Sequence, residues 1–145
     1  MSTVAVKKVR PNAILPTYGS KEAAGADLYA CLEESVTIDA GQTVFIPTGI
    51  AMEVPKGCAG LIYARSSLGT KRGLAPANKV GVIDSDYRGE IGVVLHNHGQ
   101  VAQTVAPGER IAQLLITPVL TPAYTEVDEL TDTDRGAGGF GSTGK

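Results

Sequence analysis

Short apolar stretches separated by glycine and proline run through residues 1–120. They have strand length and end at turn-forming residues, and they lie at 4–9, 36–38, 43–46, 60–63, 80–83, 91–95, 101–105 and 111–119. Many short strands at this spacing are typical of a β-sandwich or a β-barrel. No segment keeps apolar residues at helical spacing over a helical length, and only residues 66–72 are compatible with a short helix. The pattern predicts an all-β fold with at most one short helix.

The C-terminal segment has a different composition. From Thr121 onward the chain becomes acidic and then glycine-rich, ending in Arg135-Gly-Ala-Gly-Gly-Phe-Gly-Ser-Thr-Gly-Lys145. Such a segment cannot bury enough apolar surface to stay fixed by itself. We therefore expect one β body at residues 1–120 and a flexible arm at residues 121–145 that is not a separate domain.

Charge and cysteine content narrow the classes of function. The net charge is −2 and the basic residues are scattered apart from short pairs such as Lys71-Arg72, so binding of long nucleic acid would gain little from counterion release. Cys31 and Cys58 lack CxxC partners and are interpreted as free thiols. No signal-peptide pattern or run of ~20 apolar residues is present. We expect a cytoplasmic protein, or a nuclear one in a eukaryotic source, with neither a nucleic-acid nor a membrane partner.

The most informative segment is Val80-Gly-Val-Ile-Asp-Ser-Asp-Tyr-Arg-Gly-Glu-Ile91, in which two apolar stretches flank a polar turn. This pattern predicts a β-hairpin. A carboxylate at the end of an apolar strand, as at Asp84, can be held rigidly enough to take a proton from water. Aspartate also suits turn capping. Spacing alone leaves both interpretations open for Asp84 and favours capping for Asp86.

Two further segments suit anionic ligands. Ala64-Arg-Ser-Ser-Leu-Gly69, followed by Lys71 and Arg72, combines a guanidinium, two hydroxyls and backbone N–H groups that suit phosphate oxygens. A solvated basic loop is the simpler alternative. In the arm, glycines let backbone amides approach an anion, while Arg135 supplies charge and Phe140 a stacking face. A disordered terminus without function is the alternative there.

Together these segments resemble the trimeric all-β dUTPases over almost the whole chain. The five family motifs correspond, in order, to Ala24-Gly-Ala-Asp-Leu28, Ala64-Arg-Ser-Ser-Leu-Gly69, Gly81-Val-Ile-Asp-Ser-Asp-Tyr-Arg-Gly89, Gly108-Glu-Arg-Ile-Ala-Gln-Leu-Leu115 and residues 135–144. The resemblance implies a distorted jelly-roll, or β-clip barrel, and a homotrimer whose active sites are each built from three chains and closed by a neighbour's arm. It implies hydrolysis of dUTP to dUMP and pyrophosphate by water attack on the α-phosphate, which keeps uracil out of DNA and supplies dUMP for thymidylate synthesis.

The same resemblance implies individual roles. Asp84 is the expected catalytic base, and Tyr87 is expected to pack on the deoxyribose and exclude a 2′-hydroxyl. Asn78 and hairpin backbone are expected to recognise uracil. The expected substrate-binding residues are Arg65, Ser66, Ser67, Asn78, Gly81, Val82, Ile83, Tyr87, Gly92, Gln113, Arg135, Phe140, Gly141 and Ser142. Mg²⁺ is expected to be carried by the triphosphate without direct protein ligands, with Asp27 contacting it through water.

Two departures from the family pattern and two alternatives remain. Ala64 replaces the usual proline, and Ser67 stands where glycine is frequent. A dCTP deaminase-like enzyme would share the jelly-roll and the Arg-Ser-Ser-Leu segment, but those enzymes place a glutamate where this chain has Val94. A non-catalytic nucleotide-binding jelly-roll would typically lose the base or the arm, whereas Asp84, Tyr87 and Phe140 are all present.

Overall fold

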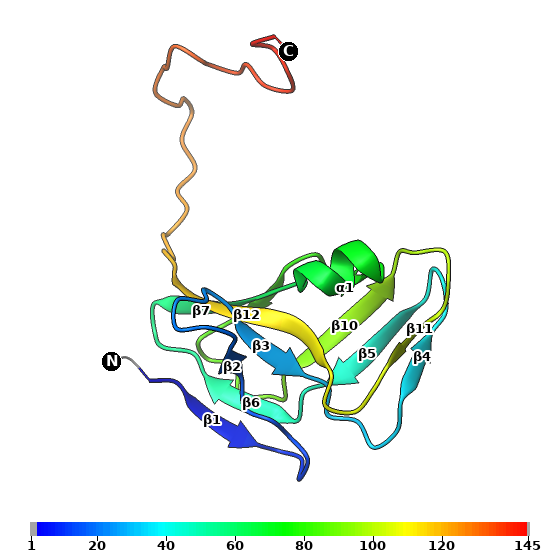
Figure 1. Ribbon diagram of the computed structural model, residues 1–145. Coiled ribbons are helices and arrows are strands. Elements are labelled where there is room, and N and C mark those ends of the chain that lie inside the picture. Colours follow the sequence, from blue (N-terminus) through cyan, green and yellow to red (C-terminus); the bar gives the residue numbers. More distant parts are fainter. Residues whose placement is uncertain (1–2, 145) are drawn as a thin grey trace.

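A computed structural model describes residues 3–144, and its regular structure is almost entirely β (Figure 1). One short helix, α1 (Ser66–Lys71), interrupts the strands. The strands are β1 (Ala5–Lys8), β2 (Thr17–Tyr18), β3 (Ala26–Tyr29), β4 (Val36–Ile38), β5 (Thr43–Pro47), β6 (Ile50–Glu53), β7 (Cys58–Tyr63), β8 (Leu74–Pro76), β9 (Gly81–Ile83), β10 (Gly92–Asn97), β11 (Gln103–Val105) and β12 (Arg110–Pro118). The prediction of an all-β fold with a single short helix is confirmed.

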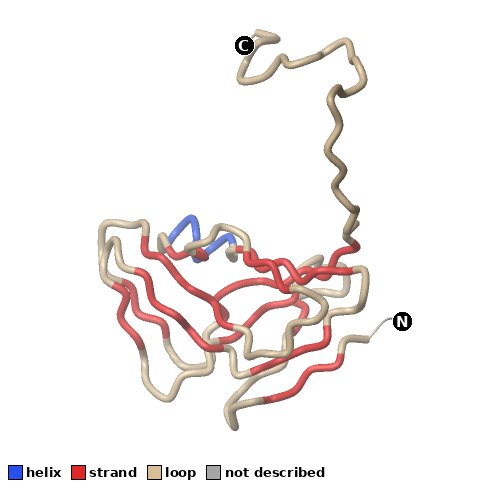
Figure 2. Tube along the Cα trace, turned by 180° about the vertical axis from the view of Figure 1, so that it is seen from behind, coloured by secondary structure: helices blue, strands red, loops and turns tan. Residues whose placement is uncertain are grey.

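The strands form four antiparallel sheets. The largest has the order β2-β3-β12-β7-β9, a second has the order β5-β10-β8, and the pairs β1-β6 and β11-β4 complete the set. Figure 2 shows these strands folded around one interior, with the helix at one end of the body. No sheet closes on itself within residues 3–144, because each strand order has two ends.

Alternation of apolar and polar residues places the core. In β10, Val93, Leu95 and Asn97 point inward, while Val94 and His96 between them are more exposed. A period of two is expected because successive side chains leave opposite faces of a strand. The buried Asn97 is fully hydrogen-bonded, donating from Nδ2 to the carbonyls of Ile38 and Val101. Its polar side chain is therefore accommodated without an unsatisfied group.

The predicted β-hairpin at residues 80–91 is wrong in its pairing. β9 pairs with β7, and β10 pairs with β5 and β8, so the two strands belong to different sheets. The local sequence predicted both strands and the polar turn. It could not show their pairing partners, because these lie elsewhere along the chain and form in place of a β9–β10 hairpin. The segment at 84–91 is therefore a connection between sheets, and the two strands spread apart where a hairpin would close.

The chain beyond β12 leaves the body. Figure 1 shows residues after Pro118 extending away from the sheets before turning near the C-terminus. Residues 119–144 contain no helix or strand, which agrees with the composition of the predicted arm. No helix among residues 3–144 is long and apolar enough to cross a bilayer.

Candidate active site

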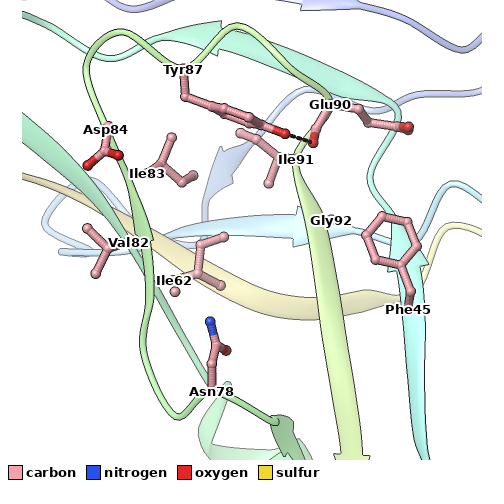
Figure 3. A pocket seen from close by; sticks show the side chains of 11 residues that line it. Phe45, Ile62, Asn78, Val82, Ile83, Asp84, Tyr87, Glu90, Ile91 and Gly92 are labelled. Carbon is pink, nitrogen blue, oxygen red and sulfur yellow. Dashed lines mark hydrogen bonds between the residues drawn. The ribbon is translucent and has the colours of Figure 1, made fainter.

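A cavity of about 300 Å³ lies where β9 and β10 spread apart (Figure 3). We call it the first pocket. It brings together seven residues that the sequence predicted: Asn78, Gly81, Val82, Ile83, Asp84, Tyr87 and Gly92. Phe45, Ile62, Glu90 and Ile91 complete the lining and were not predicted. The predicted base, sugar contact and uracil-recognising segment thus share one cavity.

Backbone polar groups are available in the first pocket because of the strand order. β9 is an edge strand, paired through Gly81–Ile83 with β7 on one side only. β8 pairs with β10 at Leu95 to Asn97, and the Ala77 amide after β8 donates to the Val94 carbonyl at 2.8 Å, which leaves the first residues of β10, Gly92 and Val93, without a β8 partner. Free N–H and C=O groups on a strand edge can bond an extended partner or a polar ligand. The missing hairpin pairing is therefore what opens the site.

Asp84 and Tyr87 stand at the rim of this pocket. Asp84 follows β9 and is exposed, and Figure 3 shows its carboxylate on the same side as the Val82 side chain. The amide of Tyr87 donates to the Asp84 carbonyl at 3.1 Å, which closes a tight turn around both residues. Tyr87 is 45% exposed as a residue, and its hydroxyl donates to the Glu90 carbonyl at 3.0 Å. A carboxylate and an aromatic face are thus held close together, open to a ligand.

Glu90 lines the first pocket but uses its carboxylate elsewhere. Both of its oxygens accept from Arg10, at 2.6 Å from Nε and 3.0 Å from Nη2. The Gly49 amide also donates to Oε1 at 3.0 Å. These hydrogen bonds and the positive charge of Arg10 hold the pKa of the Glu90 carboxyl below its ordinary value, although partial burial works in the opposite direction. The same pair raises the pKa of Arg10.

Phe45 closes the other end of the first pocket through a contact that requires glycine. Gly92 and Phe45 lie on neighbouring strands, and a Cβ on Gly92 would fall within 1.9 Å of the Phe45 ring. Only glycine permits this approach without a shift. The ring remains 55% exposed and presents an apolar face to the cavity. Sequence alone offered no signal for Phe45, because its contact with Gly92 follows from strand pairing.

A second cavity, of about 200 Å³, contains three of the residues predicted to bind phosphate: Arg65, Ser66 and Gln113. We call it the second pocket; it is lined by Gly19, Ala23, Gly25, Asp27, Arg65, Ser66 and Gln113. Gln113 donates from Nε2 to the Ala64 carbonyl at 2.9 Å and lies directly over Gly25, where a Cβ would meet its Oε1 at 2.5 Å. The second pocket shares none of its described lining residues with the first.

A β-bulge shapes the face that carries the second pocket. The register of β12 against β3 shifts between Arg110 and Ala112, so Arg110 lies opposite Tyr29 and Gln113 lies opposite Asp27. Residues three apart on one strand then share a face, which regular pleating would forbid. Arg110 thereby reaches Asp27, at 3.4 Å from Nη1 to Oδ2. Arg110 was not singled out from the sequence, although it lies within the fourth motif.

Asp27 joins two arginines rather than standing free. Its Oδ1 accepts from Arg65 Nε at 2.9 Å, its Oδ2 accepts from Arg110, and its side chain is 14% exposed. Within residues 3–144 no three His, Cys, Asp or Glu side chains gather as a metal cage. The donor set fits a cation held mainly by a ligand, since the Asp27 oxygens have lone pairs left for water.

Several predicted residues lie outside both pockets. Ser67 sits in the first turn of α1, exposed, and lines neither cavity. Arg135, Phe140, Gly141 and Ser142 lie on the arm, which Figure 1 shows directed away from the body of the same chain. Phe140 is fully exposed. The chain therefore does not bring its own arm to either pocket.

The comparisons with known proteins agree on one family. The family model described as dUTPase matches residues 11–144. The chain belongs to the dUTPase family. The deoxyuridine 5′-triphosphate nucleotidohydrolase of Syntrophotalea carbinolica is 46% identical over 98% of this chain and 97% of its own length.

Solved structures of the family extend the match to the fold. The dUTPase of Staphylococcus bacteriophage 80alpha, solved with dUpNHpp, is 29% identical and covers all of both chains at a TM-score of 0.92. A variant dUTPase of phage phi11 of S. aureus, described as revealing the coordination of a structural Mg(II) ion, is 25% identical at a TM-score of 0.80, over 88% of this chain and 98% of its own. The expected jelly-roll of the dUTPase family is confirmed, without a closed barrel.

Proposed function

We propose that the protein hydrolyses dUTP to dUMP and pyrophosphate, with Asp84 as the base that activates water. It is a dUTP diphosphatase of the dUTPase family. The observation that carries the mechanism is the first pocket, where an exposed carboxylate, an aromatic ring and unpaired strand backbone surround one cavity. By removing dUTP the enzyme keeps uracil out of DNA, and its product dUMP supplies thymidylate synthesis.

The first pocket suits a deoxyuridine. Asn78 and the free backbone edge of β9 offer both donors and acceptors to the polar edge of uracil, while Phe45 and Ile62 supply apolar walls. A pocket of this kind selects by leaving polar groups unpaired when the wrong base enters. Tyr87 would pack on the sugar and leave no room for a 2′-hydroxyl. These roles follow the family resemblance and agree with where the residues lie.

The second pocket suits a polyphosphate. Arg65 carries two NH2 groups, with four N–H donors, beyond the Nε that binds Asp27. Ser66 offers a hydroxyl, and Arg110 lies beside the same carboxylate. Guanidinium groups held by a carboxylate are already oriented when the ligand arrives. We propose that Arg65, Ser66 and Gln113 hold phosphates and the attacking water. Ser67 does not line the second pocket, so we assign it no more than a weak contact with phosphate.

The chemical step is a displacement at the α-phosphorus. The oxygen of water forms a bond to phosphorus, the bond to the bridging oxygen of the β-phosphate breaks, and pyrophosphate leaves. Asp84 takes the proton of the water. Arginine and N–H donors stabilise charge that develops on the phosphoryl oxygens. Mg²⁺ bound to the triphosphate, with Asp27 as a contact through water, would withdraw charge from those oxygens.

We propose that the working unit is a homotrimer with shared sites. Support comes from the division of the predicted site residues between two separate pockets and an arm that extends from the body. A second chain could bring its second pocket to the first pocket of its neighbour, and a third could supply Arg135, Phe140, Gly141 and Ser142 as a closing lid. Closure would exclude water around the reacting phosphates. We also propose that the protein acts in the cytoplasm, or in the nucleus of a eukaryotic source.

The rival functions have less support. Val94 occupies the strand position where a deaminase would need a glutamate, and it pairs with Phe45 on β5. A non-catalytic nucleotide binder would not need the exposed Asp84 at the pocket rim. Neither rival is named among the family matches described above.

Hydrolysis in H₂¹⁸O with Mg²⁺, analysed by mass spectrometry of the products, tests the mechanism. Attack at the α-phosphorus predicts one ¹⁸O in dUMP and none in pyrophosphate. Label in pyrophosphate would place the attack at the β-phosphorus and would remove the proposed role of Asp84. Release of orthophosphate and dUDP would overturn the proposed reaction altogether.

A further inference from the structure

We propose that Arg10 and Glu90 are positioning residues for sugar selectivity, acting through the ring of Tyr87. The inference rests on the proposed function, since it concerns how the site tells dUTP from UTP. It assigns a role to two residues that lie outside the five motifs and that were given no part in the reaction. Neither is proposed to touch the reacting phosphates.

The carboxylate of Glu90 is held from two directions. Arg10, from the segment after β1, donates two hydrogen bonds to it, and Gly49, from the turn between β5 and β6, donates a third. Gly49 is also tied to the Arg10 segment, because its carbonyl accepts from the amide of Val9 at 2.8 Å. Bidentate guanidinium pairs fix geometry as well as adding energy. Glu90 is thereby anchored to two segments that lie distant in sequence.

The backbone of Glu90 in turn holds Tyr87. The Tyr87 hydroxyl donates to the Glu90 carbonyl at 3.0 Å, its one hydrogen-bond partner in the described chain. The ring lies over Gly89, where an added Cβ would fall within 2.4 Å of the hydroxyl oxygen. Figure 3 shows the ring reaching from the Asp84 side of the loop toward Glu90, while the Glu90 side chain points away. The ring position therefore follows the position of the Glu90 peptide.

This arrangement separates positioning from folding. The Glu90 carbonyl shares a planar peptide with the Ile91 amide, which donates to the Ile50 carbonyl at 2.8 Å, and the Ile91 carbonyl accepts from the Thr48 hydroxyl at 2.5 Å. This peptide is therefore held on its strand side by Ile50 and Thr48, and on its loop side by the Glu90 carboxylate. Loss of the Glu90 carboxylate should leave the strand in place and loosen the loop before it. The proposed exclusion of a 2′-hydroxyl requires that the Tyr87 ring cannot move away from the sugar. If the loop that carries Tyr87 becomes more mobile, UTP should bind and react more readily.

The test measures kcat and KM for dUTP and for UTP in wild type, Glu90→Ala, Glu90→Gln and Arg10→Lys. The ratio of kcat/KM for dUTP over UTP should fall about fivefold or more in Glu90→Ala, the order of effect expected when a hydrogen-bonded network loses a member. Glu90→Gln and Arg10→Lys keep some hydrogen bonding but lose the bidentate ion pair. Their dUTP/UTP ratios of kcat/KM should lie between those of wild type and Glu90→Ala. The change should come mainly from better use of UTP. An unchanged ratio in folded variants would overturn the inference.

A double-variant cycle with Tyr87→Phe separates positioning from general damage. Tyr87→Phe removes the hydroxyl that donates a hydrogen bond to the Glu90 carbonyl. In a chain that already carries Tyr87→Phe, adding Glu90→Ala should therefore cause little further loss of selectivity for dUTP over UTP. Additive losses would show that Glu90 does not act through Tyr87. Glu53→Ala is the matched control: it breaks the exposed 3.9 Å pair with Arg88 on the same loop and should leave the ratio unchanged.

The wild-type measurement distinguishes two kinds of failure. If wild type does not prefer dUTP over UTP, the proposed function fails first. If wild type prefers dUTP and the variants keep that preference, only the positioning role fails.

Discussion

At the scale of single residues, the proposed mechanism depends on the position of one carboxylate. Asp84 and Asp86 belong to the same loop and are both exposed, but only Asp84 lines the first pocket. Asp86 instead lines a separate surface hollow with Ser85 and Arg88. Sequence spacing could not separate a catalytic base from a turn cap. Placement in the pocket favours Asp84 as the base.

Replacing Asp84 by asparagine should lower kcat by about 10²–10⁴-fold, because proton transfer by one positioned carboxylate is worth about that much. Asp86→Asn is the matched control and should retain activity close to wild type. Single-turnover rates with dUTP and Mg²⁺ give both values. A loss below tenfold in Asp84→Asn would remove the assignment.

The residues that sequence reasoning missed share one physical cause. Phe45 reaches the first pocket through strand pairing, the Glu90 side chain is held by an ion pair with a distant segment, and Arg110 reaches Asp27 of the second pocket through a β-bulge. None of these can be deduced from local spacing, because each depends on segments far apart along the chain. Asp84 and Tyr87, by contrast, belong to one compact motif, so their proximity could be anticipated.

At the scale of elements, the positions of strands and turns along the chain were more predictable than the pairing of the strands. Short apolar stretches located eight strands, whereas the short strands β2, β3, β6 and β8 were not anticipated. The hairpin prediction failed because β9 and β10 find better partners in two different sheets. That failure is functionally informative, since the gap between these strands is the first pocket.

The turn between β5 and β6 offers a test of element packing. Gly49 has φ of 70°, and a Cβ there would lie 2.7 Å from Cys31 Sγ and 2.8 Å from Ala13 Cβ. Gly49→Ala should therefore suffer left-handed strain of about 1–2 kcal/mol and overpacking of about 1–3 kcal/mol. Gly57 has φ of 80° with open space around it, so Gly57→Ala should show the strain alone. Equal losses in urea unfolding, at one protein concentration, would contradict this packing.

The Arg10–Glu90 pair predicts a particular pH dependence of stability. Because the pKa of Glu90 is lowered in the folded protein, the pair stabilises the fold above the ordinary carboxyl pKa and loses that effect as pH falls through the folded value. Wild type should exceed Arg10→Gln in free energy of unfolding near neutral pH, and the gap should shrink below about pH 4.5. Denaturant titrations across this range provide the measurement. A gap that stays constant into acid would contradict the ionic origin.

At the scale of the whole molecule, the arm and the two pockets predict cooperation between chains. Removing residues 135–145 should reduce turnover about five- to 150-fold, taking one base–aromatic stack as about 1–3 kcal/mol. The melting temperature should change little, because the arm is exposed and leaves the body. Turnover that survives truncation would exclude the lid.

Mixing two defective chains tests whether sites are shared. Asp84→Asn chains co-refolded with arm-truncated chains should recover activity above the sum of the separate preparations, because some sites would combine an intact Asp84 with an intact arm. Each variant refolded alone is the control. No recovery in mixed assemblies would confine each site to one chain.

The most direct measurement incubates the purified protein and Mg²⁺ separately with dUTP, UTP, dTTP and dCTP, and resolves the products by ion-exchange chromatography. The first pocket predicts conversion of dUTP alone, to dUMP and pyrophosphate. Similar cleavage of all four nucleotides would contradict base and sugar selection at that pocket. Ammonia release from dCTP would indicate a deaminase, and tight dUTP binding without turnover a non-catalytic binder.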